Sequence, residues 1–175
     1  MDDAYRFAPA APDEEYVHGA AAPGWHSAAD QAVAVSAWIE FMRDRGIRRV
    51  CCLLPGADAD GCGYNLEEYT AAFGEDNVVH APLLDRQLGD STVLEETILP
   101  FLEESVRRDE PVVVQGLSGL GRTGQVLAAW LVYGRGYQPD RAVETVEAMG
   151  RYPEEPIEFD RTTEEDLLGH LETVG

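Results

Sequence analysis

The chain has 175 residues, of which 45% are hydrophobic, and its 33 acidic and 13 basic residues give a formal net charge of −20. A chain of this length can fold as one compact domain without disulfides or a structural metal, and it holds no apolar run of the roughly 18 to 20 residues that cross a bilayer. The charge argues against free nucleic acid and anionic membranes as partners, because no basic face is available to release the counterions of a phosphate backbone.

Strands and helices are predicted to alternate along the chain. Apolar runs bounded by turn residues predict strands at 15–19, 47–54, 77–83 and 111–115. Apolar positions at helical spacing predict helices between Ser27 and Gly46, at 65–74, from Asp90 or Ser91 through Val106, at 122–133, at 139–149 and at 163–173. The helix at 122–133 is hydrophobic nearly all round, so we expect it to be central and buried.

Several helix ends carry capping or stop signals. These are Ser27 with Gly46, Asn65 with Glu68 and Gly74, and Thr162 with Glu165. Pro100 lies inside the helix that starts near residue 90, and it predicts a kink there because proline lacks a backbone N–H.

This order of elements predicts an α/β fold, a single domain with a mostly parallel central sheet and helices on both faces. No linker-like change in composition and no internal repeat interrupts residues 15–150. We expect an acidic N-terminal segment at 1–14, the domain at 15–152, and an acidic C-terminal tail with a last helix at 153–175.

The basic residues are all Arg, and none is Lys. So acidic a surface repels itself in dilute salt, and it is tolerated where concentrated salt screens charges within about 3 Å. The composition therefore predicts a halophilic protein, whereas an acidic mesophilic protein would normally contain some lysines. The first fifteen residues lack the basic flank and the apolar stretch of a signal peptide, so we expect a cytoplasmic location.

The three cysteines offer neither a disulfide framework nor the spacing of metal ligands. Cys51 and Cys52 are adjacent in a predicted strand, so their side chains should point to opposite faces and behave as small buried hydrophobes. Cys62 stands alone in a loop. We expect no metal and no cofactor.

The stretch VVVQGLSGLGRTG, residues 112–124, is a strand that runs into a glycine-rich turn and then a helix, a layout that often cradles phosphate. Its glycines fit the dinucleotide pattern G-x-G-x-x-G, but such loops belong to the first βα unit, and here the sheet is nearly finished. Residues 116–123 also fit a nucleotide-triphosphate loop, except that Arg122 stands where that loop needs a lysine. Both interpretations are weak.

A third interpretation needs a rigid turn with inward N–H groups, an arginine that grips two phosphate oxygens, and a helix N-terminus. The sequence provides glycines in the turn, followed by Arg122, Thr123 and Gly124. It resembles the signature H-C-x-x-G-x-x-R-[S/T]-G of cysteine-based protein-tyrosine and dual-specificity phosphatases of the compact archaeal type, and the resemblance covers roughly residues 15–150. The resemblance implies that phosphate is bound by Gly116, Leu117, Ser118, Gly119, Leu120, Gly121 and Arg122.

The family also uses a general-acid aspartate on a loop upstream of the nucleophile, just past a strand. Asp85 follows a predicted strand and lies 31 residues before position 116, and Asp90 is the alternative. The resemblance thus implies catalytic roles for Asp85 and Arg122, with the hydroxyl of Thr123 assisting release of the nucleophile.

Two positions depart from the signature, because Gln115 stands at the family's His and Gly116 at its nucleophilic Cys. Ser118 is expected to face away from the phosphate and has no adjacent base, and Cys62 is a remote candidate for a displaced nucleophile. Since two adjacent positions differ, natural divergence is favoured over an engineered nucleophile variant.

Backbone donors and Arg122 do not depend on the cysteine, and losing a thiolate removes a negative charge from the pocket. The sequence therefore predicts a pseudophosphatase that binds phosphate, a phosphorylated protein or a small phosphoester without covalent turnover. Two alternatives stay open. One is phosphatase activity through water activated by Asp85, and the other is a scaffold whose phosphate loop is a relic.

Overall fold

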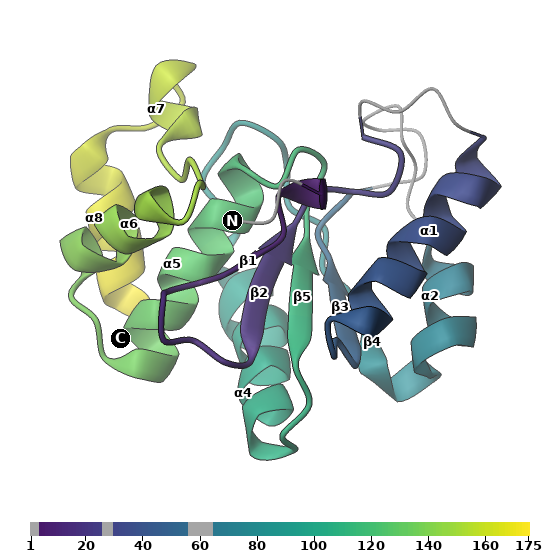
Figure 1. The fold of residues 1–175 in the computed structure, drawn as a ribbon. Coiled ribbons are helices and arrows are strands. Elements are labelled where there is room, and N and C mark those ends of the chain that lie inside the picture. Colours follow the sequence, from purple (N-terminus) through teal and green to yellow (C-terminus); the bar gives the residue numbers. More distant parts are fainter. Residues whose placement is uncertain (1–3, 26–29, 56–64) are drawn as a thin grey trace.

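The computed structural model describes residues 4–25, 30–55 and 65–175 (Figure 1). Its five-stranded sheet has the order β1 (Ala8–Pro9), β2 (Val17–Ala20), β5 (Val112–Gln115), β3 (Arg49–Cys52) and β4 (Val78–His80). Only β1 runs antiparallel, so the predicted mostly parallel sheet is confirmed. The sequence analysis missed β1, since two residues are too few to show an alternating pattern.

Helices cover both faces of the sheet, as predicted. In chain order they are α1 (Gln31–Asp44), α2 (Leu66–Phe73), α3 (Ser91–Val93), α4 (Leu99–Arg107), α5 (Gly121–Arg135), α6 (Pro139–Ala148), α7 (Glu155–Glu158) and α8 (Glu164–Val174), with short 3₁₀ turns at Ala4–Arg6 and Glu75–Asn77. In Figure 1, α1 and α2 lie on one face and α4 and α5 on the other, and α6 and α8 pack outside α5.

Each face of the sheet has its own hydrophobic core. Cys51 belongs to the core beneath α4 and α5, and Cys52 belongs to the core beneath α1 and α2, which confirms that the two side chains point to opposite faces. Burial raises the pKa of both thiols, that of Cys52 to about 11, so neither is a thiolate at neutral pH. Cys62 lies outside the described residues.

The central helix α5 is buried on every side from Gly121 to Val132, as its uniformly apolar sequence predicts. Gly136, in the left-handed conformation at φ 74°, ends it. Helix α8 adds Leu167, Leu171 and Val174 to the same core, so the C-terminal residues pack on the domain.

Three of the predicted helix starts need correction. Asp30 caps α1, its carboxylate accepting a hydrogen bond from the N–H of Ala32, and Ser27 lies outside the described residues. Asn65 precedes α2 but makes no side-chain cap. The last helix is capped by Thr163 rather than Thr162, because the Thr163 hydroxyl accepts from the N–H of Asp166. Because two threonines and two glutamates follow one another here, the sequence does not show which threonine is the N-cap.

The helix that contains Pro100 is irregular just before the proline. A π turn at Leu94–Ile98 joins α3 to α4, and Pro100 lies in the first turn of α4. Proline cannot donate the usual hydrogen bond to the preceding turn, and the wider π turn accommodates that loss. The structure thus has a π turn before Pro100, where the sequence predicted a kink at the proline.

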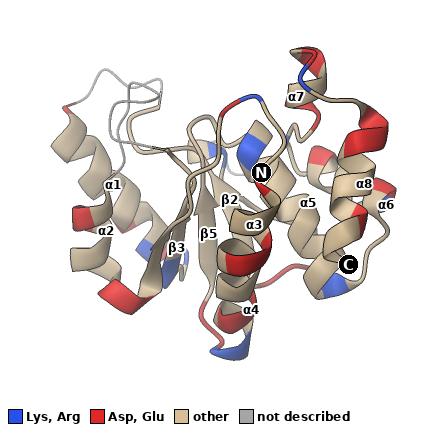
Figure 2. Cartoon of the chain, turned by 180° about the vertical axis from the view of Figure 1, so that it is seen from behind, with Lys and Arg blue, Asp and Glu red and all other residues tan. Residues whose placement is uncertain are grey.

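Acidic residues are spread over the outer helices (Figure 2). In the described part of the chain, no helix is long and apolar enough to cross a membrane.

Candidate functional site

The glycine-rich loop lies where three parallel strands end. Gln115 pairs with Ala20 of β2 on one side and with Cys52 of β3 on the other, so the segments after these strands emerge at one edge of the sheet. Gly119 has φ 78°, and a Cβ there would lie 2.8 Å from the backbone nitrogen of Ala21. Glycine is therefore required at this position, both for its conformation and for the close approach of the chain.

Every carbonyl of the loop from 116 to 120 accepts a hydrogen bond from the surrounding protein. The donors are the Gln115 side chain to Gly116 (2.5 Å), Ala22 N–H to Leu117 (2.9 Å), Arg6 to Ser118 (2.8 Å), Arg151 to Gly119 (2.7 Å), and the N–H groups of Tyr152 (3.0 Å) and Gly124 (3.1 Å) to Leu120. The acceptors of the loop are thus all engaged.

Most backbone N–H groups of the loop, unlike its carbonyls, are not hydrogen-bonded to the described protein. Among the described residues, the N–H groups of Leu117, Ser118, Gly119 and Gly121 meet no hydrogen-bond acceptor. Gly121 also begins α5, whose N-terminus contributes positive electrostatic potential. A loop with engaged carbonyls and open amides at a helix N-terminus is suited to bind an anion.

Arg122 lies beside this loop and is only 5% exposed. Its Nη1 donates to the carbonyl oxygen of Leu83 (3.2 Å), and its Nη2 lies 3.6 Å from the carboxylate of Asp85. The structure therefore brings Asp85, which the family resemblance implied as the general acid, to the edge of the same cavity. Asp90 caps α3 through the N–H of Val93 and does not line this cavity.

Thr123 lies directly behind Gly116. A Cβ placed on Gly116 would lie 2.6 Å from the Oγ1 atom of Thr123, so the hydroxyl takes up the space that a longer side chain would enter. This hydroxyl is fully buried and has no hydrogen-bond partner among the described residues. It is an unsatisfied polar group at the floor of the loop.

Gln115 and Ser118 both serve the shape of the loop. The Gln115 amide donates to Gly116 and its Oε1 accepts from the buried hydroxyl of Tyr69 (2.9 Å). The Ser118 hydroxyl accepts from the N–H of Leu120 (3.3 Å), which keeps it within the turn. Among the described residues, no base lies beside the Ser118 hydroxyl to activate it as a nucleophile.

Three residues of the site were missed in the sequence analysis. Arg6 and Arg151 each hold a loop carbonyl, and the half-buried Glu155 lines the cavity with its carboxylate against Gly121. They come from the chain ends, far from the loop in sequence, and no spacing or motif distinguishes them from the other arginines and glutamates. Only the packing of residues 4–9 and 151–159 beside the loop reveals them.

Larger hollows exist in the described part of the chain, and their linings differ from that of this cavity. One of about 830 Å³ lies against α8 and is lined by Glu164, Glu165 and Asp166, which would repel an anion. In the described part of the chain, no group of His, Cys, Asp and Glu is placed to hold a metal ion.

The chain matches a family model described as "Polymorphic toxin system, DSP-PTPase phosphatase" over residues 24–136, well over half its length. Dual specificity protein phosphatase OPG106 of Monkeypox virus is 30% identical over 67 residues, and the protein of that name from Vaccinia virus (strain Western Reserve) matches to the same extent. These matches span 38% of this chain and 39% of each viral protein.

Solved structures show the same fold. Tk-PTP in its active form is 26% identical, with a TM-score of 0.67 over 89% of this chain and 93% of that one. PTPMT1 in complex with PI(5)P is 14% identical, with a TM-score of 0.70 over 96% of both chains, a likeness that concerns the fold alone. With these matches and the strand–loop–helix geometry above, the chain belongs to the DSP-PTPase phosphatase family of polymorphic toxin systems.

Proposed function

We propose that this protein is a pseudophosphatase that binds a phosphate group in the loop of residues 116–122. The observation that carries the proposal is the difference in hydrogen bonding between the carbonyl groups and the amide groups of that loop. Its carbonyls are bound by the protein, whereas four of its amides meet no acceptor among the described residues. With Arg122 and the N-terminus of α5, these amides make a site for a tetrahedral anion.

The loss of turnover is proposed from position 116. Phosphoryl transfer needs a nucleophile and a leaving group on opposite sides of phosphorus. Asp85 can serve a leaving group next to Arg122, but at Gly116 the nearest side-chain atom is the buried hydroxyl of Thr123. That hydroxyl has no base beside it among the described residues, so the covalent step has no nucleophile.

The ligand class follows from the same geometry. A cradle of amides and one arginine recognises the phosphate rather than the group that carries it, so a phosphorylated protein or a small phosphoester is the proposed ligand. The acidic, lysine-free composition supports a halophilic protein, and we accordingly choose concentrated KCl for all assays.

Anion binding is tested by the shift in melting temperature that millimolar phosphate or tungstate produces. A ligand that binds only the folded state raises its stability, by about 1.4 kcal/mol at ten times Kd. Arg122→Ala should abolish the shift, and Arg141→Ala, which removes an exposed arginine of α6, should leave it unchanged. No shift in the unaltered protein and in Arg141→Ala would contradict the proposal and favour the relic scaffold.

The missing nucleophile is tested by restoring it. The Gln115→His/Gly116→Cys double variant should hydrolyse an aryl phosphate, provided that the Thr123 hydroxyl rotates away from the new Cβ, and the unaltered protein should not. Activity in the unaltered protein that is lost in Asp85→Asn would instead support the alternative route, in which Asp85 activates water.

A further inference from the structure

The cradle encloses little open space. The cavity bounded by Asp85, residues 116–123 and Glu155 has a volume of about 10 Å³. That is close to the smallest volume that holds one water molecule. This enclosed volume is smaller than a phosphate group, which has five heavy atoms.

The Glu155 carboxylate is the side chain positioned to move. It lies so close to Gly121 that a Cβ at that glycine would overlap its Oε2 atom. Gly121 carries one of the open amides of the loop and begins α5. The carboxylate thus stands at the helix N-terminus, where an anion would bind.

Residues 152–159 hold Glu155 over the loop. The N–H of Tyr152 donates to the Leu120 carbonyl (3.0 Å), and the N–H of Glu155 donates to the Tyr152 carbonyl (3.2 Å). At the far end, the guanidinium of Arg86 lies 4.5 Å from the ring centre of Phe159. Arg86 follows Asp85, so the segment contacts both the phosphate loop and the acid loop.

The charges that face Glu155 come from three elements. These are Asp85 and Arg86 of the acid loop, Arg122 of α5, and Glu158 of α7. Burial raises the pKa of the Glu155 carboxyl and Asp85 raises it further, while Arg122 and Arg86 lower it. The net effect is a raised pKa, so Glu155 takes up a proton more readily than an exposed glutamate.

We propose that Glu155 controls entry to the cradle, because its carboxylate lines the cavity beside Gly121 and faces Arg122 and Asp85, where its charge opposes an entering anion. The inference rests on the proposed function of the loop. A dianion entering beside Asp85 and an ionised Glu155 would place three negative groups around Arg122. A neutral Glu155 removes one of these charges and can donate a hydrogen bond to the anion.

Sulfate is the probe, because this tetrahedral ion stays dianionic between pH 5 and 8, whereas phosphate titrates in that range. Its affinity is measured by isothermal titration calorimetry in concentrated KCl at pH values from 5 to 8. We expect the affinity of the unaltered protein to fall as the pH rises, by at most about tenfold per pH unit for one linked proton. Glu155→Gln should bind about tenfold more tightly at pH 8 and show a flat profile.

Glu154→Gln is the matched control, since this neighbouring carboxylate does not line the cavity. It should behave like the unaltered protein. Titration in two buffers with different ionisation enthalpies should show proton uptake on sulfate binding that is lost only in Glu155→Gln. Equal affinities and equal pH profiles in all three proteins, or the same gain in Glu154→Gln, would overturn the role of Glu155. Absence of binding in every protein, Glu155→Gln at pH 5 included, would instead overturn the proposed function.

Discussion

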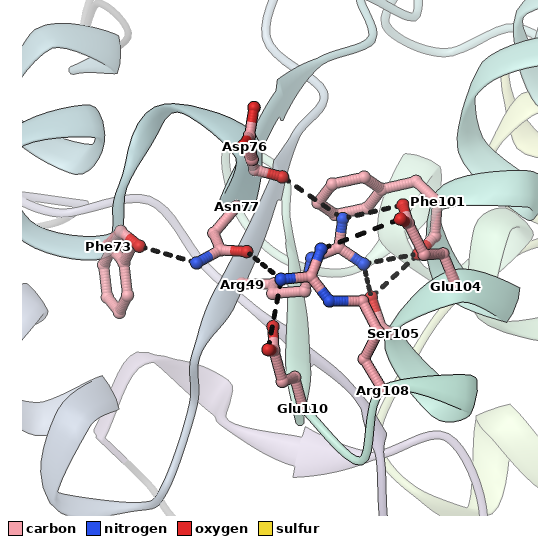
Figure 3. Close-up of polar contacts among 9 residues, drawn as sticks. All are labelled: Arg49, Phe73, Asp76, Asn77, Phe101, Glu104, Ser105, Arg108 and Glu110. Atoms are coloured by element: carbon pink, nitrogen blue, oxygen red, sulfur yellow. Dashed lines mark hydrogen bonds and ion pairs between the residues drawn. The ribbon is translucent and has the colours of Figure 1, made fainter.

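Buried arginines stand at both ends of the sheet, and their surroundings differ. Arg49, at the start of β3, donates to Ser105 Oγ (2.8 Å) and to the carbonyls of Phe101 (3.2 Å) and Asp76 (3.3 Å), and it pairs with the Glu104 carboxylate at 3.2 Å (Figure 3). Arg108 binds the same carboxylate at 3.6 Å. This end of the sheet is held together by a cation with its counter-ion.

Arg151, at the end where the phosphate loop lies, is equally buried but binds carbonyl oxygens only. It donates to Gly119 (2.7 Å), Gly19 (2.9 Å) and Ala8 (3.3 Å), and no carboxylate lies within ion-pair distance of it in the described ranges. Burial, together with the charge of Arg6, lowers the pKa of its guanidinium to about 10. A buried cation without a counter-ion costs stability, and it leaves positive charge beside a loop of open amides. Under the proposed function, the contrast separates an arginine that stabilises the fold from one that supports the phosphate loop.

The largest expected effect is the loss of stability on substituting Arg49, the arginine that is paired with Glu104. Arg49→Ala should lower the free energy of unfolding by about 3 kcal/mol, because a fully buried side chain, its hydrogen bonds and its ion pair are lost together. Sulfate affinity should not change. Denaturant unfolding in KCl measures the first quantity, and Arg48→Ala, at an exposed neighbour, is the control. A change in sulfate affinity without a loss of stability would contradict the comparison.

Arg151→Met should change sulfate affinity more than it changes stability. Stability should fall by only about 1 kcal/mol, because the loss of hydrogen bonds to the carbonyls is offset by the removal of an unneutralised buried charge. Sulfate affinity should fall about tenfold, since the Gly119 carbonyl is no longer held and the loop amides lose their orientation. Calorimetry and denaturant unfolding on the same samples test both parts. A loss of stability as large as that of Arg49→Ala, with unchanged affinity, would make Arg151 purely structural.

Acidification should decrease the stability that Glu14 contributes, because its pKa is lowered in the folded state, and increase the stability that Glu155 contributes, because its pKa is raised. Burial alone would raise the pKa of Glu14, but hydrogen bonds from Arg135 and from the N–H groups of Val17 and Tyr16 lower it overall. A lowered pKa in the folded state stabilises the protein above the unfolded-state value and is lost as the pH falls through the folded-state value. Below about pH 4.5, the unaltered protein should therefore lose melting temperature more steeply than Glu14→Gln. If melting temperature fell equally steeply with pH in both proteins, Glu14 would not contribute to the acid sensitivity of the fold.

Much of the fold could be predicted from sequence because local signals agreed with the tertiary structure. The apolar runs at 47–54 and 111–115 became β3 and β5, Gly46 and Gly74 ended their helices at φ 84° and 100°, and the all-apolar run became the buried α5. The Arg122 loop could be predicted because its residues are contiguous in the chain. Asp85 could be predicted because the family resemblance fixes its approximate separation in sequence from that loop.

The rest of the site depends on packing between distant segments. Arg151 meets Gly119 across 32 residues and Arg6 meets Ser118 across 112, and neither pair carries a local pattern. Glu155 lies in a stretch with many acidic residues, and only its contact with Gly121 distinguishes it from them. Because the supporting residues of a loop need only reach its carbonyls, their positions in the sequence are weakly constrained.

The smallest predicted effect concerns the unsatisfied hydroxyl behind Gly116. Thr123→Val keeps the shape of the side chain and removes a buried polar group without a partner, so it should raise the free energy of unfolding by about 0.5–1 kcal/mol. The same change in the Gln115→His/Gly116→Cys double variant should reduce aryl phosphate hydrolysis, because the hydroxyl then has a thiolate to stabilise. Thermal unfolding measures the first effect and steady-state kinetics the second. If Thr123→Val destabilised the unaltered protein by more than 1 kcal/mol, the hydroxyl would have a partner in solution and would not be an unsatisfied group at the floor of the cradle.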